Sequence, residues 1–331
     1  MQNNNSFPHQ NTPHNTSLMR TIILIISFTF LLTTGCAGTN NNFGTNRGKP
    51  IPQTVPTYEE FAQIQNDRVS KVDRYWSAIK MKLSWYDEEA QKKRTESGEG
   101  HLIFERPNKV ALTFSKVGEI GFWAGSNDEL FWVFEGGDSK QAFVGRNVNA
   151  FQPCCESLPI SVHPLEVIDL AGLFTFPIAT NKNDSQNHHD PAVGYSSKYG
   201  AWKLDIPGVW SFRRVYIDTT TFLPIRVELR SRLNRDISYG SADLSEYVRL
   251  NIRGKDEQVR PWVPAHFELK QSGIDGSVTL DANRPLDRTA RGPIRKQVFQ
   301  YEAVARSMKP REIHILDRRC PDSAETIIHP K

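Results

Sequence analysis

The chain has 331 residues, of which 38% are hydrophobic, with a net charge of +4 and a mean hydropathy of −0.50. This length supports one large or two ordinary domains with a sizeable core, and the polar balance excludes a multi-span membrane protein. The mild charge is spread evenly and lacks the basic stripe of a nucleic-acid binder, so we expect no nucleic-acid partner.

The N-terminus reads as an export signal. Met19-Arg20 precedes an apolar run, residues 21–32, that ends in Thr33-Thr-Gly-Cys36. The run has signal-peptide length and is too short for a transmembrane helix. We therefore predict a signal peptide over 1–35 and expect Met19 to be the true start of the protein. Its ending resembles the lipobox of bacterial lipoproteins, which implies that Cys36 is lipidated. Ordinary secretion, with Cys36 incidental, is the alternative.

Two segments precede the first predicted strand. Residues 36–56 are rich in Asn, Thr, Gly and Pro, which predicts a disordered tether behind Cys36. Thr57 is a good N-cap, with acidic residues in the first turn and an apolar stripe behind it, so residues 57–73 are predicted to form an amphipathic helix. The alternating run 76–86 is the first predicted strand.

The stretch from Ser97 to Gly145 has the pattern of an antiparallel meander. Short β-rich segments are separated by turn residues such as Asn127-Asp128 and Gly136-Gly137. The strand 110–114 alternates apolar with small or polar residues, which predicts one apolar face. The run 130–134 is apolar on both faces, so we expect it to be covered on both sides.

The middle and second half continue this pattern. Pro164 stands at a helix-start position before a short apolar helix over 165–174. Strands are predicted over 209–218, 222–232, 236–252 and 263–269, with a hairpin through Ser272-Gly273 to 274–280. The tail after Asp281 is basic and is expected to be a solvated surface, with anionic lipid headgroups as the alternative contact.

The cysteines and histidines indicate structural or solvated residues rather than a metal site. Adjacent cysteines rarely bridge each other, so either Cys154 or Cys155 is expected to pair with Cys320 in an oxidising envelope. Zinc-type spacing is absent, and His188-His189-Asp190 lies in an Asn-rich loop that we expect to be solvated. We therefore predict no metal and no cofactor.

With its elements in this order, the chain resembles the LolA/LolB-like lipoprotein-carrier superfamily. The resemblance covers Tyr58 to Leu280 and depends on the strand and Arg-Pro turn of 100–109, the strand 110–114, and the turn and aromatic strand of 126–134. It extends to 213–218, 223–228 and 262–267. The family's arginine that latches a lid over the cavity has no matching position in this sequence.

The resemblance implies a mainly β (α+β) fold, an incomplete antiparallel β-barrel with helices covering its concave face. It implies a domain over 57–280 followed by a basic extension over 281–331, and no catalytic residues. It also implies an apolar cavity for acyl chains, with the 165–174 helix as the movable lid. The side chains that would line this cavity are Leu112, Phe114, Phe122, Trp132, Leu173 and Phe174. The same side chains could instead pack together as core.

Three functions compete. The first is an anchored, periplasmic lipid or lipoprotein acceptor that acts in transfer to the outer membrane, and Ala37 after the cysteine favours that membrane. The second is a structural or assembly lipoprotein with a packed core and a protein partner. The third is a hydrolase that uses Asp205, Asp218, Glu228 or Glu246. Strand carboxylates opposite arginines are usually surface pairs, so we expect no enzyme.

Overall fold

The computed structural model describes residues 54–87, 91–138, 140–158, 163–178, 191–232, 234–271, 276–289 and 291–328. The predicted signal peptide, Cys36, most of the tether and His188-His189-Asp190 lie outside these ranges. The turn at Ser272-Gly273 lies outside them as well.

The first element is the predicted helix. α1 (Tyr58–Val69) begins after Thr57, whose side chain accepts a bond from the Glu60 backbone while the Glu60 carboxylate accepts one from Thr57. This capping box satisfies two backbone donors that the helix itself leaves free. The buried face of α1 includes Phe61, whose ring lies 6.4 Å from that of Trp202 and 5.6 Å from that of Phe222.

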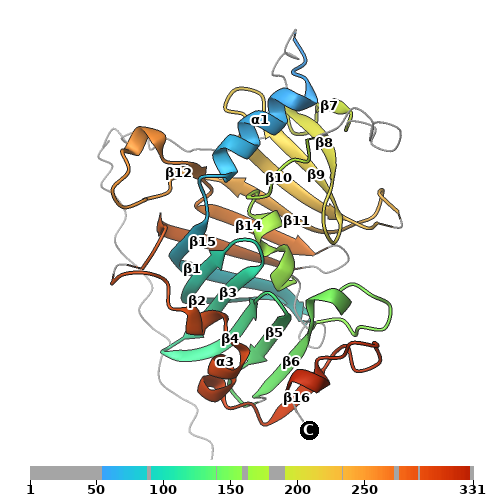
Figure 1. Ribbon diagram of the computed structural model, residues 1–331, viewed down its shortest axis with the longest axis vertical. Helices are drawn as coiled ribbons and strands as arrows, with labels where there is room; N and C mark the ends of the chain where they lie inside the picture. Colours follow the sequence, from blue (N-terminus) through green and yellow to red (C-terminus); the bar gives the residue numbers. More distant parts are fainter. Residues whose placement is uncertain are drawn as a thin grey trace, which may run out of the picture. The chain divides into compact units, whose positions relative to one another are not determined.

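Among the described residues, the main sheet contains fourteen strands in the order β16-β6-β5-β4-β3-β2-β1-β15-β14-β11-β10-β9-β8-β7 (Figure 1). Neighbouring strands are antiparallel, except that β16 runs parallel to β6. The end strands β16 and β7 do not pair with each other among the described residues, so the sheet is open. A mainly β fold with an incompletely closed antiparallel sheet was predicted, and this coarse prediction is confirmed.

The predicted meander forms one half of this sheet. Its strands are β1 (Arg74–Asp87), β2 (Lys92–Glu105), β3 (Lys109–Lys116), β4 (Glu119–Ser126), β5 (Leu130–Glu135) and β6 (Gln141–Arg146). β2 begins at Lys92, earlier in the chain than Ser97, where the predicted meander starts. The side chains of Leu130 to Phe134 are all buried, which confirms that β5 is covered on both faces.

The other half holds the later strands. They are β7 (Val193–Ser196), β8 (Ala201–Pro207), β9 (Phe212–Asp218), β10 (Pro224–Arg230), β11 (Ser238–Ser245), β14 (His266–Gln271) and β15 (Gly276–Leu286). β12 (Val248–Arg249) and β13 (Trp262–Val263) form a separate two-stranded sheet, and a 3-10 turn covers Glu257–Val259. Alternation along β10 places Val227 and Leu229 together in the core.

The segment after Asp281 corrects the predicted boundary, because it belongs to the fold. β15 continues to Leu286, and the chain then forms a 3-10 turn (Lys296–Phe299), α3 (Tyr301–Met308), β16 (Glu312–Ile315) and α4 (Glu325–Ile328). Buried side chains of this segment pack with those of β5 and β6; they are Tyr301, Val304, Ile315 and Ala324. The basic residues of 281–289 and 291–328 thus lie on a folded segment that packs on the sheet at β5 and β6.

A disulfide ties this segment to the loop after β6. Cys154 pairs with Cys320, with a Cα–Cα distance of 5.3 Å, and Cys155 is the free, half-buried thiol. The prediction that one of the adjacent cysteines bridges to Cys320 is confirmed. The bond joins residues 166 apart in sequence, so it limits the freedom of the unfolded chain over a long loop.

Candidate functional site

Residues 163–178 pack against the apolar face of the sheet, and we call this segment the strap. It starts with a 3-10 turn (Pro164–Glu166), with Pro164 at the predicted first position, and continues as α2 (Val167–Leu170). The helix is shorter than the predicted 165–174. Gly172 adopts φ +67°, a left-handed conformation typical of the residue that terminates a helix. Beyond it the strap is extended.

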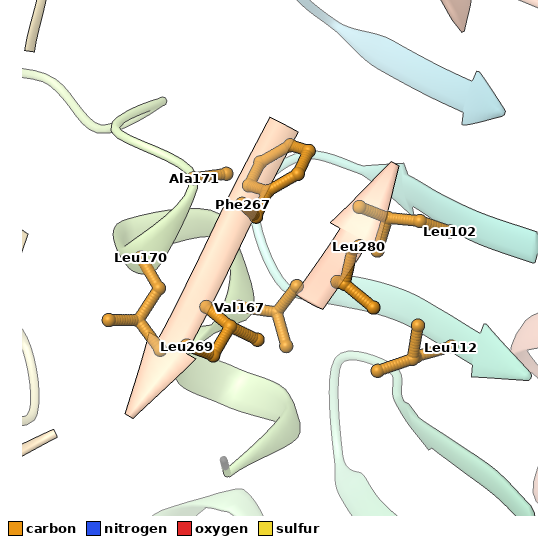
Figure 2. Close-up of a pocket in the computed structure, with 8 residues that line it drawn as sticks. All are labelled: Leu102, Leu112, Val167, Leu170, Ala171, Phe267, Leu269 and Leu280. Atoms are coloured by element: carbon orange, nitrogen blue, oxygen red, sulfur yellow. The ribbon is translucent and has the colours of Figure 1, made fainter. Parts of the chain in front are cut away.

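The space between the strap and the sheet has only apolar side chains around it. Figure 2 shows these residues, which come from the strap and from β2, β3, β14 and β15: Leu102, Leu112, Val167, Leu170, Ala171, Phe267, Leu269 and Leu280. The free volume is about 10 Å³, which is roughly the room that one water needs. The site is therefore a closed apolar seam, and an acyl chain can enter only if the strap moves.

Two carboxylates of the strap bind to the sheet. The Tyr239 hydroxyl donates a hydrogen bond to Glu166 Oε1. Arg213 Nη1 donates to Asp169 Oδ1 at 3.0 Å, and the Arg213 guanidinium lies 4.2 Å from the centre of the Phe174 ring. Burial raises the pKa of Asp169, while the charges of Arg213 and Arg106 oppose that rise. A buried charge that lacks a partner is strongly unfavourable, so this pair fixes the strap's position.

The extended half of the strap binds to α1 through its backbone. Gln65 Nε2 donates to the carbonyls of Gly172 and Phe174 at 3.0 and 2.9 Å, and Arg68 Nη2 donates to the Gly172 carbonyl at 2.6 Å. Asn66 exchanges two bonds with the backbone of Phe176, at 2.7 and 2.9 Å. Gln65 and Arg68 are one helical turn apart and both are buried, so one face of α1 holds the strap through hydrogen bonds.

The predicted cavity residues divide between two faces. Leu112 lines the seam, and Phe114, Leu173 and Phe174 are buried in the same core cluster. Phe122 is partly buried against that cluster and stacks on Phe114 at 5.7 Å. Trp132 lies elsewhere, in the cluster with Tyr301 and Val304. Alternation along β5 places it opposite Val133, so Trp132 is not part of the seam.

The polar residues that hold the strap were not among the predicted site residues. A signal for one of them exists in the sequence. In β9 the alternation puts Arg213 on the same face as Val215 and Ile217, so a charged residue stands in an apolar register. Asp169 likewise interrupts the apolar run of the strap. A charge on each of two apolar faces would have suggested that they pair.

Glu166 makes the strap sensitive to pH. Its burial raises the pKa to about 8 from 4.5; the hydrogen bond from Tyr239 opposes this rise and the nearby charge of Asp169 adds to it. Between pH 4.5 and about 8 the folded state retains a proton that the unfolded chain has released, so stability falls as the pH rises through this window.

We therefore expect Glu166→Gln to remove most of this decline. The glutamine cannot ionise, and it still offers an acceptor to Tyr239. Urea unfolding across the same pH window measures the effect, with Glu246→Gln, at an exposed carboxylate, as the matched control. Parallel stability curves for wild type and Glu166→Gln would contradict the assignment.

The carboxylates considered for hydrolysis lie apart from the seam. Asp205 accepts two bonds from Arg214, at 2.6 and 2.7 Å, and Glu228 accepts bonds from Arg226 and Arg230. Asp218 caps the turn after β9. Within the described ranges no three His, Cys, Asp or Glu side chains are grouped as metal ligands. No described helix has the length and apolar character needed to cross a membrane.

Comparisons with known proteins give distant structural likenesses. No family model and no curated protein matches the chain. A LolA superfamily protein from Nitrosomonas europaea is 13% identical, with 75% of this chain and 99% of that chain covered and a TM-score of 0.43. A DUF1329 family protein from Desulfovibrio piger is 13% identical, with coverages of 74% and 97% and a TM-score of 0.44.

A third structure, an outer membrane lipoprotein-sorting protein domain from Vibrio parahaemolyticus, is 12% identical, with coverages of 75% and 99% and a TM-score of 0.43. One of the three thus carries the name of the superfamily that the sequence resembles, and another is named for lipoprotein sorting. At such identities and TM-scores the likeness says nothing of what this chain binds.

Proposed function

We propose that this chain is an anchored lipoprotein of the cell envelope that binds the acyl chains of a lipid or lipoprotein beneath the strap. In this proposal it acts in transfer to the outer membrane, with Cys36 as the lipidated residue and the helical elements as the cover of the concave face. The tether of 36–56 would let the domain reach about 25 Å from the membrane. No catalytic step is part of the proposal.

The observation that supports the proposal most is that the seam is lined by apolar side chains while polar bonds hold the strap over it. Every residue that lines the seam is apolar, whereas the strap is attached by a few identifiable polar bonds to α1 and the sheet. Opening the strap exposes apolar surface, and an incoming acyl chain recovers about 0.8 kcal/mol per buried CH₂. The ligand can therefore take the place of the strap's own side chains.

A second candidate function rests on the closed seam itself. With about 10 Å³ of free volume, the same side chains serve as a packed core. The chain would then be a structural lipoprotein that uses its surface for a protein partner.

Native mass spectrometry of the chain, purified from membranes without removing lipid, separates the two functions. We expect one lipid mass per protein. Ala171→Leu should reduce this adduct because the larger side chain fills the seam, whereas Ala142→Leu, buried on the other face of the sheet, should retain it. Both variants should lose about 1–3 kcal/mol of stability from overpacking. A lipid-free mass for the wild type would favour the structural function.

A further inference from the structure

Two turns at one end of the sheet expose large apolar side chains side by side. Arg230 of β10 pairs in register with Phe212 of β9 and with Ser238 of β11, so the turns 208–211 and 231–237 are neighbours. Val209 in the first turn is 68% exposed, and Ile237 in the second is 55% exposed. Val209 and Ile237 thus both present an aliphatic side chain to solvent at the same end of the sheet.

A third loop adds to this surface. Phe151, 38% exposed, stacks on Trp210 with ring centres 5.5 Å apart, and Val148 in the same loop is 58% exposed. We call Val148, Phe151, Val209, Trp210 and Ile237 the corner patch. Phe151 also lies 4.7 Å from the ring of His163, the first residue of the strap. The corner patch therefore adjoins the point where the strap begins.

Two arginines border the corner patch. Arg232 Nη2 donates to the Gly208 carbonyl at 2.8 Å, and the Arg235 guanidinium lies 3.8 Å from the centre of the Phe212 ring. Both side chains are exposed, and no described carboxylate forms an ion pair with either. The arginines on the outer face of the neighbouring strands, by contrast, are all paired with carboxylates; these are Arg214, Arg226 and Arg230.

The turn that carries Arg232 and Arg235 has a positive net charge. Residues 231–237 contain Arg232 and Arg235 and one acid, Asp236. Cations without a carboxylate partner, next to exposed aliphatic and aromatic side chains, match the chemistry of an anionic bilayer surface. There the arginines face phosphates, the tryptophan lies at headgroup depth, and the aliphatic tips reach the acyl boundary.

We infer that the corner patch docks on an anionic phospholipid surface. A bilayer fits better than a peptide, because the apolar tips stand on three separate loops. Docking there would bring the start of the strap next to the lipid. The inference adds a membrane-facing side to the proposed function, and it holds whether or not the strap opens.

Vesicle co-sedimentation of residues 36–331, the chain without its predicted signal peptide, tests this, with Cys36→Ser in every variant so that no lipid anchor contributes. The vesicles contain phosphatidylcholine alone or an equal mixture with phosphatidylglycerol. We expect binding to the mixed vesicles. Val209→Asp with Ile237→Asp should abolish it, and Arg232→Ala with Arg235→Ala should weaken it about thirtyfold. The matched control is Val259→Asp, at a valine that is 55% exposed in another turn.

Circular dichroism confirms that each variant is folded. The inference would be overturned if the parent did not bind the mixed vesicles, or if Val259→Asp reduced vesicle binding as much as the patch variants. It would also be overturned if Val117→Asp, at the β3–β4 tip, abolished binding and the patch variants did not. Self-association of the parent that Val209→Asp dissolves, without vesicle binding, would also overturn it and assign the patch to a second copy of the chain. Vesicle binding by a chain that carries no lipid in native mass spectrometry would keep the docking surface and refute the acyl-chain site.

Discussion

Asp169→Ala is expected to lower the free energy of unfolding by about 3–5 kcal/mol, because it leaves the charge of Arg213 buried without a partner. The Arg213 side chain is only 8% exposed, and its remaining contacts are the Pro207 carbonyl and the Phe174 ring. Neither of these supplies a counter-charge. The loss of stability should therefore be one of the largest that a single polar substitution produces in this chain.

The double variant Asp169→Leu with Arg213→Met should recover most of the loss or exceed the wild type. Burial raises the pKa of Asp169 even beside Arg213, so the pair offsets only part of its own desolvation. Buried ion pairs of this kind can often be replaced by apolar side chains without a loss of stability. If the double variant is as unstable as Asp169→Ala, the pair contributes more than its own desolvation removes.

Urea unfolding measures both effects, and β9 offers a matched control. Asp205→Ala removes the partner of Arg214 on the opposite face of the strand, where the Asp205 side chain is 37% exposed. This pair is partly exposed and bidentate, so the variant should lose about 1 kcal/mol, the upper end of the range for exposed pairs. Equal losses from Asp169→Ala and Asp205→Ala would show that the strap pair is not effectively buried.

Local signals predicted the elements that depend on local chemistry. The helix after Thr57 followed from its N-cap and apolar stripe, and β10 lies within the strand predicted over 222–232. The face of Trp132 could not be assigned in this way. Where both faces of a strand are apolar, period-2 alternation separates the two sets of side chains but does not say which set meets which partner. Only the packing of α3 on β5 decides that.

The segment after Asp281 was misjudged for a different reason. Its many basic residues led to the prediction of a solvated surface. The apolar residues Tyr301, Val304, Ala305 and Met308 nevertheless recur at helical spacing and predict the apolar face of α3. β16 has four residues, and its parallel pairing with β6 connects distant parts of the chain. No pattern within so short a run can show such a pairing.

The hydrogen bonds from α1 that hold the strap could not be predicted from the sequence, for a third reason. Gln65, Asn66 and Arg68 bind backbone atoms of Gly172, Phe174 and Phe176, and backbone acceptors leave no trace in the sequence. Residue types predicted an apolar helix at 165–174, and only the resemblance implied that it covers the sheet. The bonds that hold it there could be found only from the fold.

The most direct test of the acyl-chain site is to lock the strap. A Cβ built on Gly172 lies 3.3 Å from Pro224 Cβ on β10, close to the separation that a disulfide spans. Gly172→Cys with Pro224→Cys should therefore bridge the strap to the sheet with a small shift. The left-handed backbone at Gly172 makes the cysteine cost about 1–2 kcal/mol. Cys155→Ser in every variant removes the one free thiol among the described residues, and Cys36→Ser removes the remaining cysteine.

Binding of a fluorescent fatty acid is then measured before and after reduction of this bridge. The parent with Cys155→Ser passes through the same cycle, since the reductant can also open Cys154–Cys320. We predict that oxidation weakens the apparent affinity of the double-cysteine variant about 100-fold or more, because the open state is no longer populated, and that reduction restores it. Equal affinity with the strap locked and free, or no binding by the parent, would contradict an acyl-chain site beneath the strap.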